Sequence, residues 1–278
     1  MNILHISPYV PSVHASHAGG VCMGKELEAL RKKHNVFVLS FINDEKEEKL
    51  VEKEFKNDNK SFFVYSNMYT KGLNALTHLN KPIFFGIRSS RKFKRLLLNI
   101  VRENSIDVIH AEYTAMGQFV WIKKYFPNIR FNLVEHDVTK QSYDRYCKGS
   151  SGIKHVYQKW QSNLVNKNEE VCLKKCDQVF TLNYKDKNLL SKYYGIQNVE
   201  VITPYYGIDF DAVQNIHVEK EENSICFVGL MSRSENHEAA MRLIQIVQDL
   251  PNDLNVKLNI IGAYPNDELK SFESSRIH

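Results

Sequence analysis

The chain has 278 residues, which is long for one hydrophobic core and comfortable for two domains. Hydrophobic residues make up 43 % and charged residues 25 %, as is ordinary for a globular protein. The formal net charge of +5 is too small to indicate a dedicated nucleic-acid binder, so we expect no nucleic-acid partner.

Apolar, β-rich runs alternate with helical patterns from the start of the chain to residue 207. The expected strands are residues 2–9, 35–42, 61–66, 106–113, 129–137, 177–183 and 199–205. The expected helices are residues 20–33, 44–57, 88–104, 116–125, 152–176 and 185–194. Strands joined by helical crossovers predict a parallel sheet with helices on both faces. Residues 1–207 are therefore expected to form an α/β domain.

The pattern changes after residue 207. Residues 208–223 are polar and lack a clear period, so we interpret them as a linker. In residues 224–278 the pattern restarts with an expected strand, helix and strand at 225–229, 237–250 and 256–262. These elements are too few for an independent core, so we expect them to begin a second α/β domain that is not completed here.

Two adjacent glycines, Gly19 and Gly20, stand where the first expected strand gives way to the first expected helix. A helix N-terminus attracts anions, and glycine lets a phosphate or a sugar approach the backbone closely. The spacing matches neither the dinucleotide fingerprint G-x-G-x-x-G nor a phosphate-binding loop ending in GK[ST]. A glycine pair that only relaxes the turn is the alternative.

Polar and aromatic residues stand at or just beyond the carboxyl ends of several expected strands, where open parallel sheets bind their ligands. They are Tyr9, Glu112, Tyr113, His136, Asp137, Tyr205, Gly207 and Asp209. In the second domain, Arg233 lies between a strand and a helix N-terminus, a position that suits a diphosphate. A structural role for His136 and a plain surface charge at Arg233 are the alternatives.

The five cysteines are scattered and form no C-x-x-C pairs, which indicates reduced thiols and no metal site. The first ten residues lack the features of a secretory signal, and no apolar run reaches the roughly 18–20 residues of a membrane span. We therefore expect a cytoplasmic protein. The basic cluster within Arg88–Arg95 also suits peripheral contact with the inner face of the cell membrane, with a solvated basic face as the alternative.

Taken in order, these segments resemble the retaining glycosyltransferases of family 4, which have the GT-B fold of two Rossmann-like domains around a cleft. The matching segments are "ILHISPYVPS…AGGVCMGKELEALRKKHNVFVLS", "DVIHAEYT", "LVEHDV", "DQVFTLN", "VEVITPYYGID" and "ICFVGLMSRSENHEAAMRLI". The resemblance implies sugar transfer from a nucleotide-sugar donor to a surface-polysaccharide or lipid-linked acceptor. It places the acceptor on the side of residues 1–207 and the donor on the side of residues 224–278.

The resemblance also implies roles for single residues. Gly19 and Gly20 would approach the donor phosphate and the acceptor, His136 would contact the donor sugar at the reaction centre, and Arg233 would bind the diphosphate. The other residues at the strand ends would line the cleft. No metal or separate cofactor is implied, because basic groups and helix ends stabilise the leaving diphosphate.

The chain departs from the family's pattern in three places. Asn236 and His237 stand where a lysine is usual, and Tyr206 stands where an asparagine is usual. The family's paired glutamates, spaced E-x7-E, would lie beyond His278, so we expect little or no transferase activity from these 278 residues. A non-catalytic sugar- or partner-binding remnant is the alternative. A Rossmann-type epimerase or dehydrogenase is disfavoured, because its dinucleotide fingerprint and Tyr-x-x-x-Lys pair are not recognisable.

Overall fold

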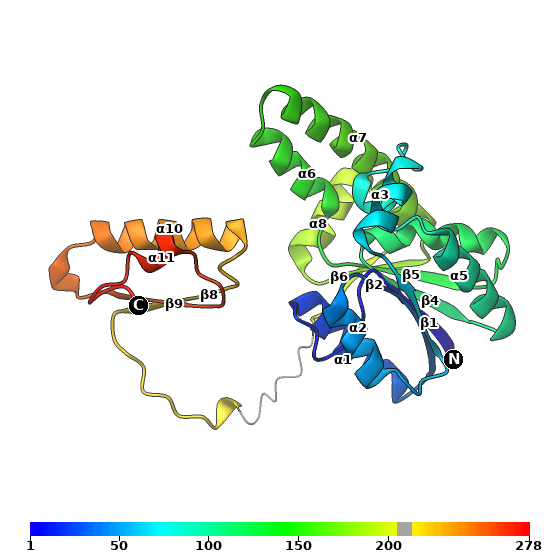
Figure 1. Cartoon of the computed structure of the whole chain (residues 1–278), viewed down its shortest axis with the longest axis horizontal. Helices are drawn as coiled ribbons and strands as arrows, with labels where there is room; N and C mark the ends of the chain where they lie inside the picture. Colours follow the sequence, from blue (N-terminus) through cyan, green and yellow to red (C-terminus); the bar gives the residue numbers. More distant parts are fainter. Residues whose placement is uncertain (205–212) are drawn as a thin grey trace. The chain divides into compact units, whose positions relative to one another are not determined.

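The computed structural model describes residues 1–204 and 213–278 of the chain. It consists of two compact units, Met1–Ile208 and Asp209–His278. Both units are built from parallel strands and helices, which confirms the expected fold class (Figure 1). Within the described residues, no helix is both long and apolar enough to span a membrane.

The first unit is organised around a seven-stranded parallel sheet with the order β3-β2-β1-β4-β5-β6-β7. Its strands are β1 (Asn2–Ser7), β2 (Asn35–Ile42), β3 (Ser61–Tyr65), β4 (Val108–Glu112), β5 (Arg130–Glu135), β6 (Gln178–Thr181) and β7 (Val199–Val201). The chain runs outward from β1 to β3 and then returns to place β4 on the other side of β1. A topological switch point therefore lies between β1 and β4, where open α/β sheets bind ligands.

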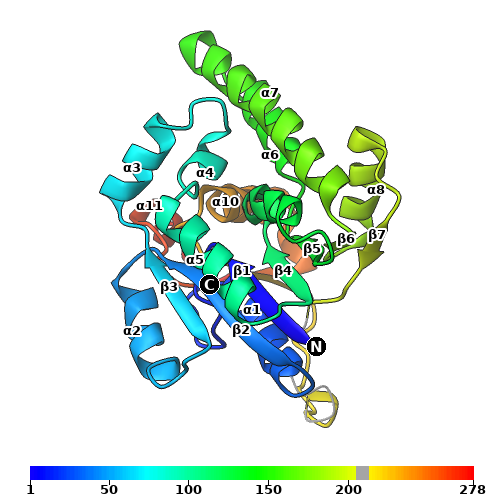
Figure 2. The same cartoon turned by 90° about the vertical axis from the view of Figure 1, so that its right-hand side faces the viewer.

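Helices and one 3-10 helix connect these strands (Figure 2). They are α1 (Ala18–Arg31), α2 (Glu45–Glu54), α3 (Met68–Leu76), α4 (Ile83–Gly86), α5 (Arg91–Glu103), the 3-10 helix Thr114–Lys124, α6 (Thr139–Lys148), α7 (Gly152–Lys175) and α8 (Tyr184–Tyr194). Polar side chains cap several N-termini: Asp44 accepts from Glu47 N, and Ser90 accepts from Phe93 N. The helices α3, α4 and α6 were not expected from the sequence.

The expected α-helix at 116–125 is instead the 3-10 helix Thr114–Lys124. Most of its side chains are buried, and packing explains the tighter winding better than helical propensity does. A Cβ atom on Gly117 would lie 3.0 Å from both Cys172 Cβ and Leu133 Cδ2. The segment is pressed between β5 and α7, so tertiary contacts override the local preference.

Alternate residues of the central strands face opposite sides of the sheet. On β1, Leu4 and Ile6 pack into the larger core with Phe93 and Leu97 of α5. Ile3 faces the other side and packs with Leu27 of α1. Because side chains alternate along a strand, His5 points to the same side as Ile3. A histidine thus replaces an apolar residue beneath α1.

The second unit contains β8 (Ser224–Val228) and β9 (Lys257–Ile261), which pair in parallel. Its helical segments are α10 (Ser234–Asp249), the 3-10 helix Asn252–Leu254 and α11 (Asp267–Lys270). Ala240, Ile244 and Val247 form the buried face of α10 and belong to one small core with Leu258 of β9.

Candidate functional site

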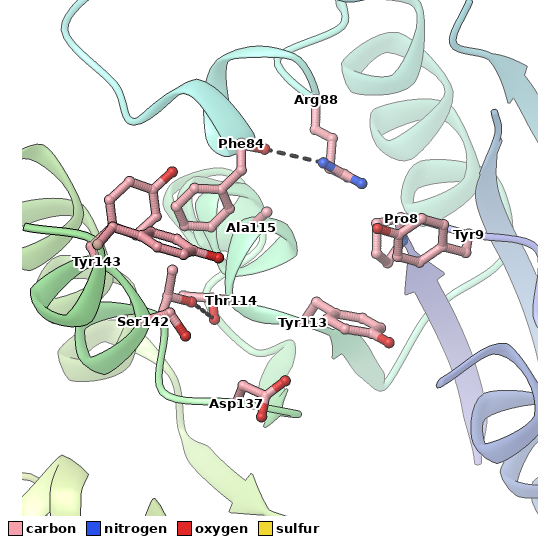
Figure 3. Close-up of a pocket in the computed structure, with 12 residues that line it drawn as sticks. Pro8, Tyr9, Phe84, Arg88, Tyr113, Thr114, Ala115, Asp137, Ser142 and Tyr143 are labelled. Carbon is pink, nitrogen blue, oxygen red and sulfur yellow. Dashed lines mark hydrogen bonds between the residues drawn. The ribbon is translucent and has the colours of Figure 1, made fainter. Parts of the chain in front are cut away.

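A pocket of about 300 Å³ lies at the carboxyl ends of β1, β4 and β5, beside the switch point (Figure 3). Its lining combines aromatic rings, hydroxyl groups and two charged side chains. The lining residues are Pro8, Tyr9, Phe84, Arg88, Tyr113, Thr114, Ala115, Asp137, Thr139, Ser142, Tyr143 and Tyr146. Aromatic faces and convergent polar groups of this kind suit a polar ligand with apolar ring faces, such as a sugar.

Tyr113, which lines this pocket, stacks against His136, which lines another pocket of about 270 Å³. Their ring centroids are 3.8 Å apart and their planes differ by 3°. Tyr9 meets the Tyr113 ring edge-on, with centroids 5.6 Å apart. Tyr113 has a φ of +68°, which a bulky residue rarely adopts, and such strain persists where surrounding packing imposes it. Burial and the neighbouring Tyr9 and Glu112 raise the pKa of the Tyr113 hydroxyl, so it keeps its proton.

The carboxylate of Glu112 holds the imidazole of His136 in place by a hydrogen bond. His136 Nε2 lies 2.7 Å from Glu112 Oε2, and both side chains are buried. Burial alone would raise the pKa of Glu112, but the imidazoles of His110, His136 and His5 outweigh burial and hold it well below its ordinary value. Glu112 is therefore a carboxylate that accepts a hydrogen bond from His136 Nε2–H. This bond uses Nε2, so Nδ1 is the ring nitrogen of His136 that can interact with other groups.

Arg88 belongs to the pocket. Its side chain is almost fully buried, and its guanidinium lies 5.3 Å from the centroid of the Tyr9 ring (Figure 3). Nη1 donates to Phe84 O at 3.3 Å, while Nε has no hydrogen-bond partner among the described residues. Arg88 thus differs from the exposed Arg91, Lys92 and Arg95, with which the sequence analysis grouped it as a membrane contact.

The glycine pair lies in the first turn of α1. The amide of Gly20 donates to His17 Nδ1 at 3.0 Å, so His17 caps the helix. Gly19 faces Tyr113, and a Cβ atom there would lie 1.9 Å from the Tyr113 hydroxyl oxygen. The glycines thus allow close packing of the pocket's rim against α1. Their contact with a donor phosphate stays a prediction.

Other predicted residues are not part of this pocket. Arg233 lies in the second unit, directly before α10, with an exposed side chain whose Nε is 3.7 Å from Glu235 Oε2. Its role in diphosphate binding stays a prediction. Tyr205, Gly207 and Asp209 lie outside the described residues.

Sequence reasoning missed the part of the pocket that α4 and α6 supply. Phe84 comes from α4, and Ser142, Tyr143 and Tyr146 come from α6. The rings of Phe84 and Tyr143 lie 6.1 Å apart and join the two segments. A run of tyrosines at helical spacing was the available signal, but without apolar neighbours it did not indicate a helix.

The sequence matches the family model described as Glycosyltransferase Family 4 over residues 23–212. One solved structure with a similar fold is the lipopolysaccharide outer core galactosyltransferase WaaB in its apo form, at 14 % identity and a TM-score of 0.59. A second is the sucrose-phosphate synthase from Thermosynechococcus elongatus, at 13 % identity and a TM-score of 0.59. A third is Phytolacca americana UGT2 complexed with UDP-2-fluoro-glucose and pterostilbene, at 8 % identity and a TM-score of 0.56.

Each of the three alignments covers 100 % of this chain, with 67 % of WaaB and 70 % of each of the other two chains. At these identities the likeness shows a shared fold. No curated protein sequence matches the chain.

Proposed function

Because the chain belongs to glycosyltransferase family 4, we propose that it acts in the transfer of a sugar from a nucleotide-sugar donor to a glycan or lipid-linked acceptor. The observation that carries this proposal is the stacking of His136, held by Glu112, on Tyr113, which lines the pocket beside the switch point. The type of reaction is inferred from the family, and the pocket is the proposed binding site of the acceptor.

In this proposal the acceptor sugar occupies the pocket between Tyr9, Tyr113 and Tyr143. Aromatic rings pack against the apolar faces of sugars, and the hydroxyl groups of Thr139 and Ser142 are hydrogen-bond partners for sugar hydroxyls. Arg88 adds a buried positive charge whose Nε lacks a hydrogen-bond partner in the described part of the chain. An arginine of this kind favours an acceptor with an anionic group, such as the phosphate of a lipid-linked sugar.

His136 acts on the donor sugar in this proposal. The carboxylate of Glu112 fixes its ring orientation and its tautomer, so the second ring nitrogen has a defined direction. Such preorganisation lowers the barrier because the group needs no reorientation during reaction. Arg233 would stabilise the leaving diphosphate by its charge, together with the N-terminus of α10. We propose no metal for this step.

A lipid-linked acceptor would bring the protein to a membrane surface, and two exposed apolar faces support such contact. On α3, Met68, Tyr69, Leu73 and Leu76 are exposed, and none of the helix's residues is buried. At the start of α7, Ile153, Val156 and Trp160 are exposed as well. The segment after α3 is joined to α7 where Ile83 N donates to Gln161 Oε1 at 2.9 Å.

Basic residues accompany these apolar faces and indicate which surface they meet. Arg145, Lys148, Lys154 and Lys159 of α6 and α7 are exposed around the tip of the helical pair. Apolar residues bordered by lysine and arginine suit an anionic lipid surface. We therefore place the membrane contact on α3 and the start of α7, a different position from the basic cluster around α5.

Sugar transfer itself is the direct test of the proposed function. Membranes of cells that produce the chain would be incubated with radiolabelled UDP-, GDP- and ADP-sugars, and label in the extracted lipids and glycans would be counted. Because we expect little transfer by these 278 residues, we expect at most weak incorporation from one donor class, lowered further, by up to about 100-fold, in His136→Asn, since such losses follow removal of one well-placed group. The exposed His14→Asn is the control. Incorporation that His136→Asn leaves unchanged would refute the proposal.

A further inference from the structure

A second cluster of polar side chains lies beneath α1, on the face of the sheet opposite α5. His5 of β1 and His110 of β4 are register partners on neighbouring strands, so their side chains point to the same face. Glu112 lies two residues further along β4 and faces the same way. Glu26 of α1 approaches from above, with about a quarter of its side chain exposed.

Nitrogen and oxygen atoms converge in this cluster. His110 Nε2 lies 2.9 Å from Glu26 Oε1 and 3.2 Å from Glu112 Oε1. His5 Nε2 lies 3.3 Å from the same Glu112 oxygen. One ligand atom from each of Glu26, His110 and Glu112 can be chosen so that all lie within 4.8 Å of one another.

These short separations are ion-pair contacts that lack hydrogen-bond geometry. His5 Nε2, His110 Nε2 and Glu112 Oε1 are buried, and none has a hydrogen-bond partner among the described residues. Both side-chain nitrogens of His5, whose side chain is wholly buried, are left in this state. Buried polar atoms without partners are costly, so a cluster of them calls for a ligand that satisfies all of them together.

We propose that Glu26, His110 and Glu112 bind a Zn²⁺ ion, with a water molecule as the fourth ligand. Tetrahedral zinc holds nitrogen and oxygen ligands at about 2.0–2.2 Å, which places neighbouring ligand atoms about 3.3 Å apart. The separations of 2.9 Å and 3.2 Å between His110 Nε2 and the two carboxylates are close to that spacing. One imidazole with two carboxylates also forms a ligand set that zinc accepts.

The surroundings of the cluster provide access and a role. Glu26 and His110 both line a pocket of about 400 Å³ under α1, through which an ion can reach them. The two oxygens of Glu112 have different neighbours: Oε1 faces this cluster, and Oε2 holds His136. The ion would thus fix the carboxylate that positions His136, and would lie behind the stacked rings, outside the acceptor pocket. Sequence reasoning considered only cysteines as metal ligands, and Glu26 is far from His110 and Glu112 in the chain.

Zinc binding by the reduced, full-length chain tests this proposal without any assay of transfer. The protein would be stripped with a chelator, loaded with Zn²⁺, passed over a chelating resin and measured for zinc by mass spectrometry. We expect one ion per chain and a higher melting temperature in its presence. Co²⁺ in place of Zn²⁺ should give a visible spectrum without a thiolate charge-transfer band. A chain that retains no zinc, or a cobalt spectrum with a thiolate band, would overturn the proposal.

Two variants and one control locate the ion. Glu26→Gln removes a ligand near the surface of α1, and His110→Gln removes a buried one. Each should weaken zinc binding at least about tenfold. His237→Gln is the matched control, because His237 Nε2 lies 3.3 Å from Glu268 Oε2 in the second unit. If His110→Gln does not fold, as judged by circular dichroism, Glu26→Gln decides the matter. Zinc affinity unchanged in Glu26→Gln would refute the site.

Discussion

Gly19 lies directly against the hydroxyl group of Tyr113. A Cβ atom on Gly19 would stand 1.9 Å from the Tyr113 oxygen, closer than packed atoms can approach, and 3.1 Å from its Cζ. Tyr113 cannot move away easily, because its ring is stacked on His136 and meets Tyr9 edge-on. The glycine at the start of α1 therefore determines where the rim of the pocket lies.

Replacing Gly19 by alanine should destabilise the protein by about 1–3 kcal/mol, the usual cost of overpacking. Tyr113→Phe removes the oxygen that the new methyl group would meet, so it should recover part of this loss in the double variant. Denaturant unfolding of the two single variants and the double variant measures the coupling. Gly72→Ala in α3 is the control, since no atom lies within 4 Å of the added group. Additive effects of Gly19→Ala and Tyr113→Phe would contradict this packing.

Arg88→Gln should weaken binding of an anionic acceptor and leave binding of the nucleotide sugar unchanged. The buried guanidinium supplies the pocket's positive charge, and a charge-assisted hydrogen bond contributes about 1.5–3 kcal/mol. We therefore expect the KM for the acceptor to rise by about tenfold or more, with Arg88→Lys between wild type and Arg88→Gln. Arg91→Gln, which removes an exposed charge on α5, serves as the control. An equal rise of KM in both glutamine variants would contradict a specific role for Arg88.

Glu135 should make the protein less stable as the pH rises. Its side chain is buried and accepts a hydrogen bond from the Thr114 hydroxyl, and Oε1 has no hydrogen-bond partner among the described residues. Burial, together with the negative charges of Glu169 and Asp137, raises the pKa of Glu135 well above its ordinary value of 4.5. Above about pH 4.5 the folded state keeps a proton on Glu135 that the unfolded chain has released. Unfolding therefore releases this proton, and the free energy of unfolding falls as the pH rises.

Glu135→Gln removes this titration and keeps the shape of the side chain. The free energy of unfolding of the variant should fall less steeply from about pH 5 to about pH 8 than that of the wild type. Denaturant titrations at several pH values measure the slope. Glu170→Gln, which changes a half-buried carboxylate paired with Lys174, should leave the slope unchanged. The prediction fails if Glu135→Gln and Glu170→Gln give the same slope as the wild type.

Leu73→Glu and Trp160→Glu should weaken association with anionic vesicles. Both side chains are exposed on the faces that we assign to membrane contact, so neither change should unfold the protein. Sedimentation with vesicles of phosphatidylglycerol and phosphatidylcholine measures the bound fraction, which should fall with salt for the wild type. Lys92→Glu on α5 is the control for the alternative basic face. A larger loss of vesicle binding in Lys92→Glu than in Leu73→Glu and Trp160→Glu would contradict this assignment and indicate that α5 makes the membrane contact.

The sequence predicted most of the strands, the parallel sheet and a second α/β unit, because apolar runs and helical spacing report directly on burial. It also predicted that a set of strand-end residues lies at one edge of the sheet, since parallel strands end together. These residues are Tyr9, Glu112, Tyr113, His136 and Asp137. It did not predict the 3-10 helix at Thr114–Lys124, whose winding depends on the contact of Gly117 with Cys172 and Leu133.

The sequence also did not indicate that Arg88 is buried, because the residue stands in a basic run that is typical of a surface. The convergence of Glu26 and His110 was missed for another reason. The register of β1 with β4 and the position of α1 above the sheet bring together residues that are far apart in the chain. Such contacts depend on tertiary packing and leave no periodic signal.

Ligand binding in the pocket beside Tyr113 and His136 tests the account most directly. Saturation-transfer NMR with glycosyl phosphates should show magnetisation transfer to the sugar protons in the wild-type chain. Arg88→Gln and Tyr113→Ala should abolish most of this transfer, while Arg91→Gln should not. A wild-type chain that gives no transfer with any glycosyl phosphate, or equal transfer in all variants, would contradict an acceptor site in this pocket.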